Sequence, residues 1–208
     1  MFQISKKKKN MYFRTRKTAS SSITKILEKY DIINVVQTSI LDPKKRIFKR
    51  SNRIFYEHSD PLQIKLLFNL DNYFKIISIR NPLTMIKSMF FWTHRNKTLS
   101  QKNIKSYFLK WMRKKDYENI KKNDIFFKYN KYNFVIRYEF LKDDLKKLLN
   151  HFEIYDYILL DNILNDNDDD NLKKNIKKYD ISYEKKDIKY ITNHFKKFKI
   201  LSSYFNKD

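Results

Sequence analysis

Six consecutive residues near the N-terminus combine the groups that bind an anion and stabilise developing negative charge. They are Lys17, Thr18, Ala19, Ser20, Ser21 and Ser22. A strand-like apolar segment precedes them, and Ile23, Ile26 and Leu27 follow at helical spacing. A helix N-terminus presents unpaired backbone N–H groups and the positive end of the helix dipole, to which hydroxyl groups and a lysine add donors and charge. The segment therefore predicts a phosphate-binding loop, with a serine-rich helix cap as the alternative.

The only alanine of the chain lies inside this segment, and the chain contains no glycine. The usual nucleotide-binding loop, GxxxxGK[ST], needs glycine and is therefore absent. A different phosphate loop can tolerate alanine where the backbone approaches its ligand, but few larger side chains. We expect Ala19 to keep the turn after Lys17 and Thr18 thin enough for a ligand to lie against the backbone amides.

A second strand-to-helix junction carries an arginine and a serine. Arg80 ends an apolar strand-like segment, Pro82 begins a helix-like segment, and Ser88 follows about two turns later. A guanidinium and a hydroxyl group on such a rigid junction could grip a second phosphate group. The alternative is that Arg80 caps the sheet and that Ser88 is an ordinary helix serine.

Strand-like and helix-like patterns alternate along the chain. The strand-like segments are residues 11–15, 32–37, 53–61, 73–80 and 132–139, and the helix-like segments are residues 20–30, 61–70, 82–95, 104–114 and 140–154. The alternation predicts an α/β protein, a three-layer sandwich with a central, mainly parallel sheet. In such sheets ligands bind beyond the carboxyl ends of the strands, where both junctions lie. Residues 161–175 are acidic and are predicted to form a surface loop, and residues 183–205 a docked final helix.

The length and composition indicate one folded domain with a short basic extension. With 208 residues, of which 41% are hydrophobic and 16% aromatic, the chain can bury a core. We assign residues 1–10 to a basic N-terminal arm and residues 11–208 to a single domain. The net charge of +23 favours an anionic partner, but a lysine-rich, glycine-free composition also arises in any protein from an AT-rich genome, so we give it little weight. The arm is expected to be solvated, with peripheral membrane contact as the alternative.

The sequence shows no membrane-spanning or secretory signal. No apolar run reaches the roughly 18 residues of a membrane span, and no apolar region follows Lys6–Lys9 that could form a signal peptide. The chain has no cysteine, which excludes disulfides and thiolate metal sites and fits a reducing compartment. Its histidines are isolated, and residues 161–175 lack the glycine and the terminal glutamate of a calcium loop. We therefore expect a cytoplasmic protein that requires no metal.

The segments RTRKTASSSI and IRNPLTMIKS together resemble the two cofactor motifs of sulfotransferases that use 3′-phosphoadenosine 5′-phosphosulfate (PAPS). The first is similar to the 5′-phosphosulfate loop, and the second to the arginine-to-serine element that holds the 3′-phosphate. The Lys-Thr-Ala-Ser form is most similar to the carbohydrate sulfotransferases, in particular to the heparan sulfate 2-O-sulfotransferase group. The segments FVIRYEFLKDDLKKLLNHFEI and FKILSSYF are similar to a later strand and helix and to the closing helix of the family, so the likeness covers about Tyr12–Tyr204. The sequence departs from the family pattern at Asn81 and Phe140, where acidic residues are usual.

This resemblance implies a P-loop NTPase-like sulfotransferase fold. It also implies transfer of the sulfuryl group of PAPS to a hydroxyl acceptor, with a carbohydrate as the expected one. By the same resemblance, Arg16 and Lys17–Ser22 bind the 5′ end of the cofactor, and Arg80 and Ser88 bind its 3′-phosphate. Lys17 would stabilise the negative charge that grows on the departing bridging oxygen.

The reaction also needs a base for the proton of the attacking hydroxyl group. We expect His58, because the reference pKa of histidine is about 6.5 and because the end of strand-like segment 53–61 should face the same edge of the sheet as Lys17. The alternative for His58 is a strand-end histidine bonded to backbone, and Glu57 is the reserve base. Other histidines are weaker candidates: His94 lies near the second junction, and His151 and His194 are expected to be structural.

Several interpretations stay open at the level of sequence. Arg14 and Arg16 share one face of their strand, so the residues do not decide which of them contacts an anion. Trp92 and Trp111 could stack on sugar rings, although core positions are favoured for both. Two rival functions are a basic protein that binds nucleic acid or another polyanion, and an inactive nucleotide-binding relative. The chain has no recognisable RNA-binding or helix-turn-helix motif, so no specific nucleic-acid partner is expected.

Overall fold

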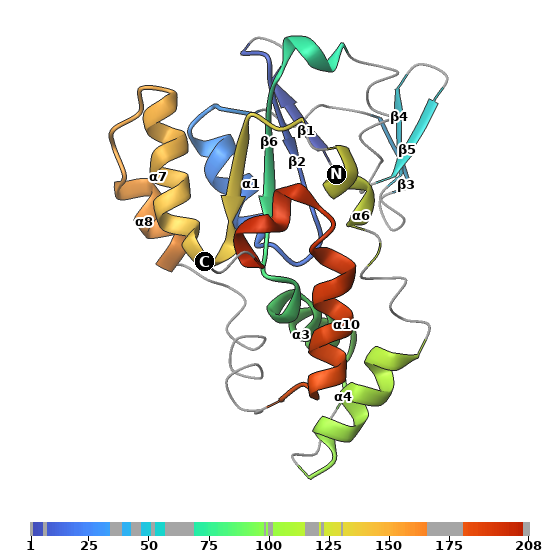
Figure 1. Ribbon diagram of the computed structural model, residues 1–208. Helices are drawn as coiled ribbons and strands as arrows, with labels where there is room; N and C mark the ends of the chain where they lie inside the picture. Colours follow the sequence, from blue (N-terminus) through green and yellow to red (C-terminus); the bar gives the residue numbers. More distant parts are fainter. Residues whose placement is uncertain are drawn as a thin grey trace.

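The computed structural model describes most of the chain and contains two β-sheets with helices packed against one of them (Figure 1). The described residues are 2–5, 8–33, 39–42, 47–50, 53–56, 69–97, 99, 102–114, 121, 123–129, 131–165 and 181–205. Among the described helices, none combines the length and the apolar character needed to cross a membrane.

The central sheet has four strands in the order β1-β2-β6-β7. The strands are β1 (Phe2–Ser5), β2 (Asn10–Phe13), β6 (Phe74–Ile79) and β7 (Phe134–Arg137). Strand β1 runs antiparallel to β2, whereas β2, β6 and β7 are mutually parallel. The register pairs Phe13 with Ile77, and Ile79 with Arg137, so the three parallel strands end at the same edge of the sheet. The prediction of an α/β protein with a parallel sheet is confirmed for this core.

The segment assigned to the N-terminal arm contributes to this sheet. Strand β1 lies within it and pairs with β2 from Phe2 opposite Phe13 to Ser5 opposite Asn10. The Lys8 ammonium forms an ion pair with Asp31 at 3.0 Å, and Lys9 lies over the ring of Tyr73. Both of these lysines contact the folded domain.

Helices cover both faces of the central sheet because successive side chains of each strand point to opposite sides. On one face, Tyr12, Ile76 and Ile136 pack in a core against helices at the left of Figure 1. These helices are α1 (Ser20–Lys29), α7 (Leu141–His151) and α8 (Ile158–Asn165). On the other face, Phe13 and Ile77 belong to a larger core. It includes side chains of η1 (Leu70–Asn72), α3 (Pro82–Thr93), α4 (Ile104–Arg113), α6 (Asp124–Tyr129), α10 (Lys185–Phe195) and η3 (Lys199–Tyr204).

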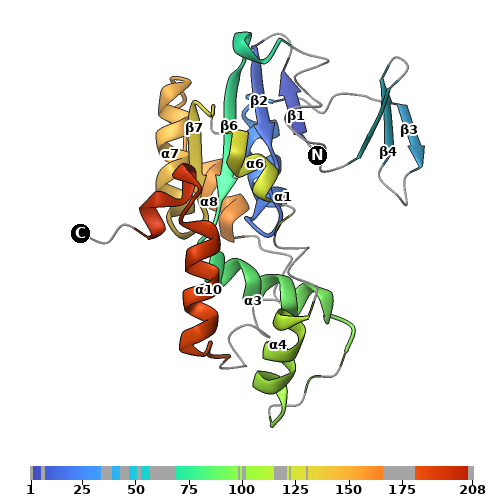
Figure 2. The same cartoon turned by 45° about the vertical axis from the view of Figure 1, so that its right-hand side comes forward.

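A second, small sheet stands apart from the central one in both views (Figure 1, Figure 2). It is antiparallel and contains β3 (Ser39–Asp42), β4 (Ile47–Arg50) and β5 (Arg53–Tyr56). The sequence analysis expected the strand at 53–61 to join the main sheet, and this expectation is wrong for β5. Two residues separate β4 from β5, so the two strands pair as a local hairpin. The backbone of β5 therefore forms its hydrogen bonds with β4 and not with a strand of the central sheet. Of the strand expected at 32–37, Ile32 and Ile33 are described, and they are buried outside any strand.

The predicted helices at 20–30, 82–95, 104–114 and 140–154 are confirmed as α1, α3, α4 and α7. The helix expected at 61–70 lies largely outside the described residues. The prediction of a surface loop at 161–175 is wrong for its first five residues, which are part of α8. Leu160 of this helix is fully buried, and Ile163 and Leu164 pack against the same core, so apolar burial outweighs the polar character of the segment.

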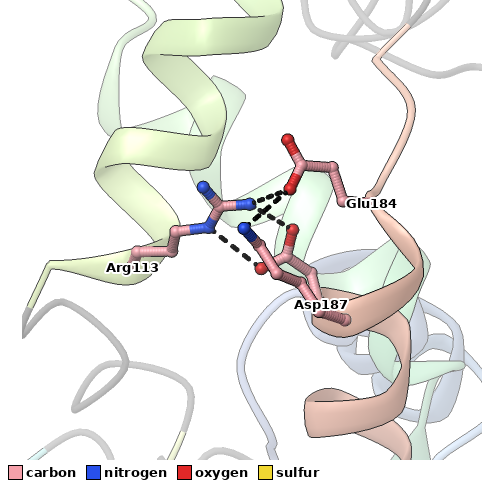
Figure 3. A network of polar contacts seen from close by, with 4 residues as sticks. Arg113, Glu184 and Asp187 are labelled. Atoms are coloured by element: carbon pink, nitrogen blue, oxygen red, sulfur yellow. Dashed lines mark hydrogen bonds and ion pairs between the residues drawn. The ribbon is translucent and has the colours of Figure 1, made fainter.

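The tail forms helix α10 followed by the short 3₁₀ segment η3, and an ionic network joins α10 to α4 (Figure 3). The Arg113 guanidinium donates to both oxygens of Asp187 at 3.0 and 2.7 Å and to Glu184 at 2.6 Å. Hydrogen bonds to Asp187 and Glu184 raise the pKa of Arg113 above its usual value. Asp187, Ile191 and Phe195 of α10 are buried, whereas Ile188 is 40% exposed. The buried side chains agree with the prediction that the tail docks on the domain.

Candidate functional site

The two sequence motifs meet at the edge of the sheet where the parallel strands end. The first motif forms the loop between β2 and α1, and the second forms the junction between β6 and α3. Strands β2 and β6 are neighbours, so these junctions lie side by side. The direct contact is a hydrogen bond of 3.2 Å from Arg80 Nη1 to the carbonyl oxygen of Lys17, which is 63 positions away in the sequence.

The loop between β2 and α1 has an unusual backbone for a chain without glycine. Lys17 and Ala19 adopt left-handed conformations, with φ of 61° and 56°. A side chain with a Cβ atom disfavours this conformation by about 1–2 kcal/mol per residue. Ala19 therefore occupies a position that glycine would normally take, and alanine is the smallest residue that this chain uses. This backbone angle gives a physical reason for a small residue at position 19. The expectation that Ala19 keeps the turn thin enough for a ligand stays a prediction.

Helix α1 begins without a side-chain cap. Ala19 is its N-cap residue and has no side-chain acceptor, and the first turn holds no acidic residue. The first bond of the helix runs from Ile23 N to Ala19 O at 3.0 Å, so the amides of Ser20, Ser21 and Ser22 precede the helical hydrogen-bond ladder. Such amides and the helix dipole together favour an anion.

Buried hydroxyl groups anchor this loop to the sheet. Ser78 Oγ lies 2.8 Å from Tyr12 Oη and 2.7 Å from Thr18 Oγ1, and Thr15 Oγ1 lies 2.9 Å from Thr18 Oγ1. All four residues are fully buried, and burial raises the pKa of Tyr12 above its usual value. The hydroxyl group of Thr18 therefore serves the interior, and the part of Thr18 that remains to meet a ligand is its backbone amide.

Asn123 forms two hydrogen bonds with the backbone of the same loop. It was not predicted from the sequence. Its Oδ1 accepts a hydrogen bond from Arg16 N at 3.0 Å, and its Nδ2 donates to Arg16 O at 3.2 Å. The side chain is completely buried just before α6. A single asparagine in a polar stretch has no periodic signal, so only the fold could identify it. The loop is also held by Arg14, whose Nη2 donates to Ser21 Oγ at 3.2 Å.

Arg80 supports the loop from the second junction. Its Nε donates to Thr84 Oγ1 at 3.0 Å, and its guanidinium carbon lies 3.9 Å from the ring centroid of Tyr138. The side chain is only 8% exposed, and burial lowers its pKa from the usual value. Among the described residues, its second terminal nitrogen, Nη2, has no hydrogen-bond partner.

One face of α3 contacts both Arg80 of the second motif and Lys17 of the first. Thr84, Ser88 and Trp92 recur every four positions and therefore share a helix face. Thr84 contacts Arg80 at one end of this face, and the ring of Trp92 lies beneath the Lys17 ammonium at the other, 5.5 Å from Nζ to the ring centroid. Ser88 lies between these contacts, is 3% exposed, and its hydroxyl group has no hydrogen-bond partner among the described residues. The fold thus brings Arg80 into contact with the backbone of Lys17, and Ser88 lies on the helix face between Thr84 and Trp92.

A carboxylate outside the predicted site holds the second junction. Glu139 Oε1 accepts hydrogen bonds from Asn81 N at 3.0 Å and Thr84 Oγ1 at 3.1 Å, and Oε2 accepts one from Tyr204 Oη at 2.6 Å. Burial and this hydrogen bond raise the pKa of Tyr204 above its usual value. The position of Glu139 directly after a strand in the sequence RYE was the available signal.

The predicted base is not among the residues that the structure describes. His58 and Glu57 both fall outside the described ranges. The geometric reason for choosing His58 no longer holds, because β5 pairs in the small antiparallel sheet and does not share the edge of β2 and β6.

Each of the other three histidines contacts another residue of the domain. His94 is buried with Nδ1 2.8 Å from Phe90 O, and His151 stacks on Phe74. His194 Nε2 lies 3.0 Å from an oxygen of Asp124. Within the described residues, no group of three or more His, Cys, Asp or Glu side chains could hold a metal ion.

In comparisons with known proteins, no family model, no curated protein and no solved structure matches this chain.

Proposed function

We propose that this protein is a PAPS-dependent sulfotransferase with a P-loop-like sulfotransferase fold, acting on a hydroxyl acceptor that is expected to be a carbohydrate. The observation that carries the proposal is the contact between Arg80 and the Lys17 carbonyl group, which joins two motifs expected to bind the two ends of one nucleotide. Neighbouring strands bring the two junctions together, and the hydrogen bond from Arg80 places its guanidinium directly against the loop.

The residues present fit such a nucleotide. The uncapped amides at the start of α1 suit the 5′-phosphosulfate, with Lys17 at the mouth of the loop. Arg80 Nη2 and the Ser88 hydroxyl group, both without partners among the described residues, suit the 3′-phosphate. When bound, PAPS supplies a sulfuryl group attached to a phosphate that can leave.

The protein would accelerate transfer by orientation and by charge. The acceptor oxygen forms a bond to sulfur while the bond from sulfur to the phosphate oxygen breaks, and the acceptor proton passes to a base. A lysine ammonium near the departing oxygen stabilises the charge that develops there. The left-handed backbone at Lys17 and the hydrogen bond to its carbonyl group fix where its side chain starts. His58 stays the base expected from the sequence on its side-chain chemistry alone, because the shared sheet edge that also favoured it is not observed. The cytoplasmic location likewise remains a prediction from the sequence.

Thermal unfolding with the product nucleotide, 3′,5′-adenosine bisphosphate, tests the proposal. We expect the nucleotide to raise the Tm of the wild-type protein and to have little effect on Lys17→Ala or Ala19→Leu. Lys29→Ala is the matched control, because it removes the same charge from the opposite end of α1 and should keep the full shift. Absence of any shift at millimolar nucleotide would contradict the proposal.

Two further measurements separate the rival functions. Transfer of labelled sulfate from PAPS to glycans, lipids and phenols would establish activity, whereas nucleotide binding without transfer to any acceptor would favour an inactive relative. Tight, steeply salt-dependent binding to arbitrary DNA or RNA, without a nucleotide-induced shift, would favour a polyanion-binding protein.

A further inference from the structure

The face of α3 that carries Thr84 borders the candidate site and is only partly packed. Thr84 is exposed in the first turn of the helix, and Trp92 at the other end of the face is 48% exposed. The expectation of a core position is therefore wrong for Trp92, and it is correct for Trp111, which is 7% exposed. An exposed threonine adds little to core packing, so any larger contribution of Thr84 comes from its hydroxyl group.

The hydroxyl group of Thr84 lies between one donor and two acceptors. Arg80 Nε donates to Thr84 Oγ1 at 3.0 Å. Thr84 Oγ1 in turn lies 3.0 Å from Asn81 O and 3.1 Å from Glu139 Oε1. A guanidinium can only donate, whereas a carbonyl group or an ionised carboxylate can only accept, so the direction of each bond is fixed. The single proton of the hydroxyl group is directed to the two acceptors, and a lone pair faces Arg80.

Glu139 is itself held by two further hydrogen bonds. Its Oε1 accepts one from Asn81 N at 3.0 Å, and its Oε2 accepts one from Tyr204 Oη at 2.6 Å. Tyr204 belongs to η3, so the C-terminal part of the described chain holds the carboxylate that orients Thr84. The carboxylate cannot turn away from Thr84 without loss of these bonds.

The contacts of Arg80 differ in what they fix. The ring of Tyr138, 3.9 Å from the guanidinium carbon, restrains one face of the group. The hydrogen bond from Nη1 to Lys17 O fixes one nitrogen, and the hydrogen bond from Nε to Thr84 fixes a second. Because the guanidinium is planar, bonds at Nε and Nη1 together set the direction of Nη2, which has no hydrogen-bond partner among the described residues.

We propose that Thr84 is a positioning residue that fixes the Arg80 guanidinium for binding of a nucleotide phosphate. The inference rests on the proposed function, in which Arg80 Nη2 binds the 3′-phosphate. Without the hydroxyl group of Thr84, the guanidinium keeps one hydrogen bond and one ring contact, and it can turn about that hydrogen bond. Because Thr84 acts through Arg80, its removal should affect recognition of the 3′-phosphate and not of the 5′ end.

Calorimetry with two nucleotides tests this role, because adenosine 5′-monophosphate lacks the 3′-phosphate of 3′,5′-adenosine bisphosphate. We expect Thr84→Val to weaken binding of the bisphosphate about five- to tenfold and to leave the affinity for the monophosphate unchanged. Thr84→Ser keeps a hydroxyl group and should retain most of the affinity. Thr93→Val is the matched control in the last turn of α3, because Thr93 Oγ1 donates to Met89 O. Thr84→Ala replaces Thr84→Val in the comparison if the valine is not tolerated.

A double-mutant cycle shows whether Thr84 acts through Arg80. Arg80→Lys keeps the charge but has no Nε–H group, so Thr84→Val should have no further effect in this background. A further loss of the same size there would overturn the inference. Equal losses for Thr84→Val and Thr84→Ser, or for the two nucleotides, would also overturn it, as would an unchanged affinity of Thr84→Val. Absence of bisphosphate binding in the wild type would instead contradict the proposed function.

Nuclear magnetic resonance tests the contact without any nucleotide. The Nε–H signal of Arg80 is the arginine side-chain signal that disappears in Arg80→Lys. We expect this signal to shift and its proton to exchange faster with water in Thr84→Val, and to stay close to wild type in Thr84→Ser and Thr93→Val. An Arg80 signal that is the same in wild type and Thr84→Val would overturn the inference, whether or not the nucleotide binds.

Discussion

At the junction between β2 and α1, the helix starts without a side-chain cap, and Lys17 and Ala19 adopt left-handed conformations. At the neighbouring junction between β6 and α3, Asn81 Oδ1 accepts a hydrogen bond from Leu83 N at 2.9 Å, and Pro82 occupies the first turn. Both are strand-to-helix turns at the same edge of one sheet. The first leaves its helix without a side-chain cap and holds two residues in a strained conformation, whereas a side chain caps the backbone amide of Leu83 at the second.

The second junction stabilises the first. Arg80 donates to the carbonyl group of Lys17, and Ser78 on the same strand bonds to the hydroxyl group of Thr18. A strained backbone persists only where its surroundings hold it firmly, and β6 supplies much of that hold. This arrangement teaches that a strained loop without glycine depends on hydrogen bonds from a neighbouring strand. Substitutions at either junction can test this dependence.

Removal of Arg80 should have the largest effect. Arg80→Leu deletes the hydrogen bonds to Lys17 O and Thr84 and the contact with Tyr138, so we expect a loss of about 3 kcal/mol in the free energy of unfolding. Chemical denaturation measures the loss. The exposed Arg95 is the control, and Arg95→Leu should change stability by less than about 1 kcal/mol. Equal losses in the two variants would show that Arg80 does not support the loop.

The buried hydroxyl cluster should give the next largest effect. Ser78→Ala leaves the hydroxyl groups of Tyr12 and Thr18 without their shared partner, and we expect a loss of about 2 kcal/mol. Ser20→Ala, at the first position of α1, should cost less than about 0.5 kcal/mol. Urea unfolding of both variants compares the buried anchor of the loop with the start of the helix. A larger loss for Ser20→Ala would reverse these assignments.

The cap of α3 should contribute a smaller amount. Asn81→Ala removes the acceptor for Leu83 N, and the free energy of unfolding should fall by about 1 kcal/mol. Asn103 is a matched control, since it is the N-cap residue of α4 but its side chain makes no capping hydrogen bond. Asn103→Ala should therefore cost only a few tenths of a kcal/mol, roughly a third of the effect at Asn81. Thermal unfolding that shows the same loss for both would contradict the assigned cap.

The smallest effect should have the opposite sign. Ala19→Gly relieves the left-handed strain at φ 56°, and we expect the free energy of unfolding to rise by about 0.5–1 kcal/mol. Ser22→Gly, in the first turn of α1, should lower it by about 0.5 kcal/mol, because glycine disfavours a helical backbone. Denaturant titrations of the two variants compare Ala19, whose backbone is left-handed, with Ser22, whose backbone is helical. A loss at Ala19→Gly would mean that no strain is stored there.

Much of the local structure could be predicted from sequence. The apolar pattern with Ile23, Ile26 and Leu27 indicated α1, and Pro82 marked the start of α3. These signals are local, because helix spacing and proline act on their own segment. The pairing of β5 could not be read in the same way. A strand pattern shows that a segment is extended but does not identify its partner, and the nearby β4 provided one.

The site shows the same division. Lys17, Arg80 and Ser88 were selected from residue type and from their positions at two junctions. The structure shows a direct contact between Arg80 and Lys17. Asn123 and Glu139 were not assigned to the site, because each acts through contacts with residues far away in the chain. The exposure of Trp92 was also missed, since an apolar pattern does not reveal which side of a helix the rest of the protein leaves uncovered.

The sequence by itself determined the α/β alternation, the two strand-to-helix junctions, and the presence of a lysine, hydroxyl groups and an arginine at them. These follow from short-range periodicity and turn chemistry, which depend on neighbouring residues alone. The tertiary structure decided that Arg80 reaches the Lys17 carbonyl group, that Thr18 turns inward to Ser78, and that Trp92 lies beside Lys17. Such contacts depend on strand order and register, which are set by the packing of the whole core.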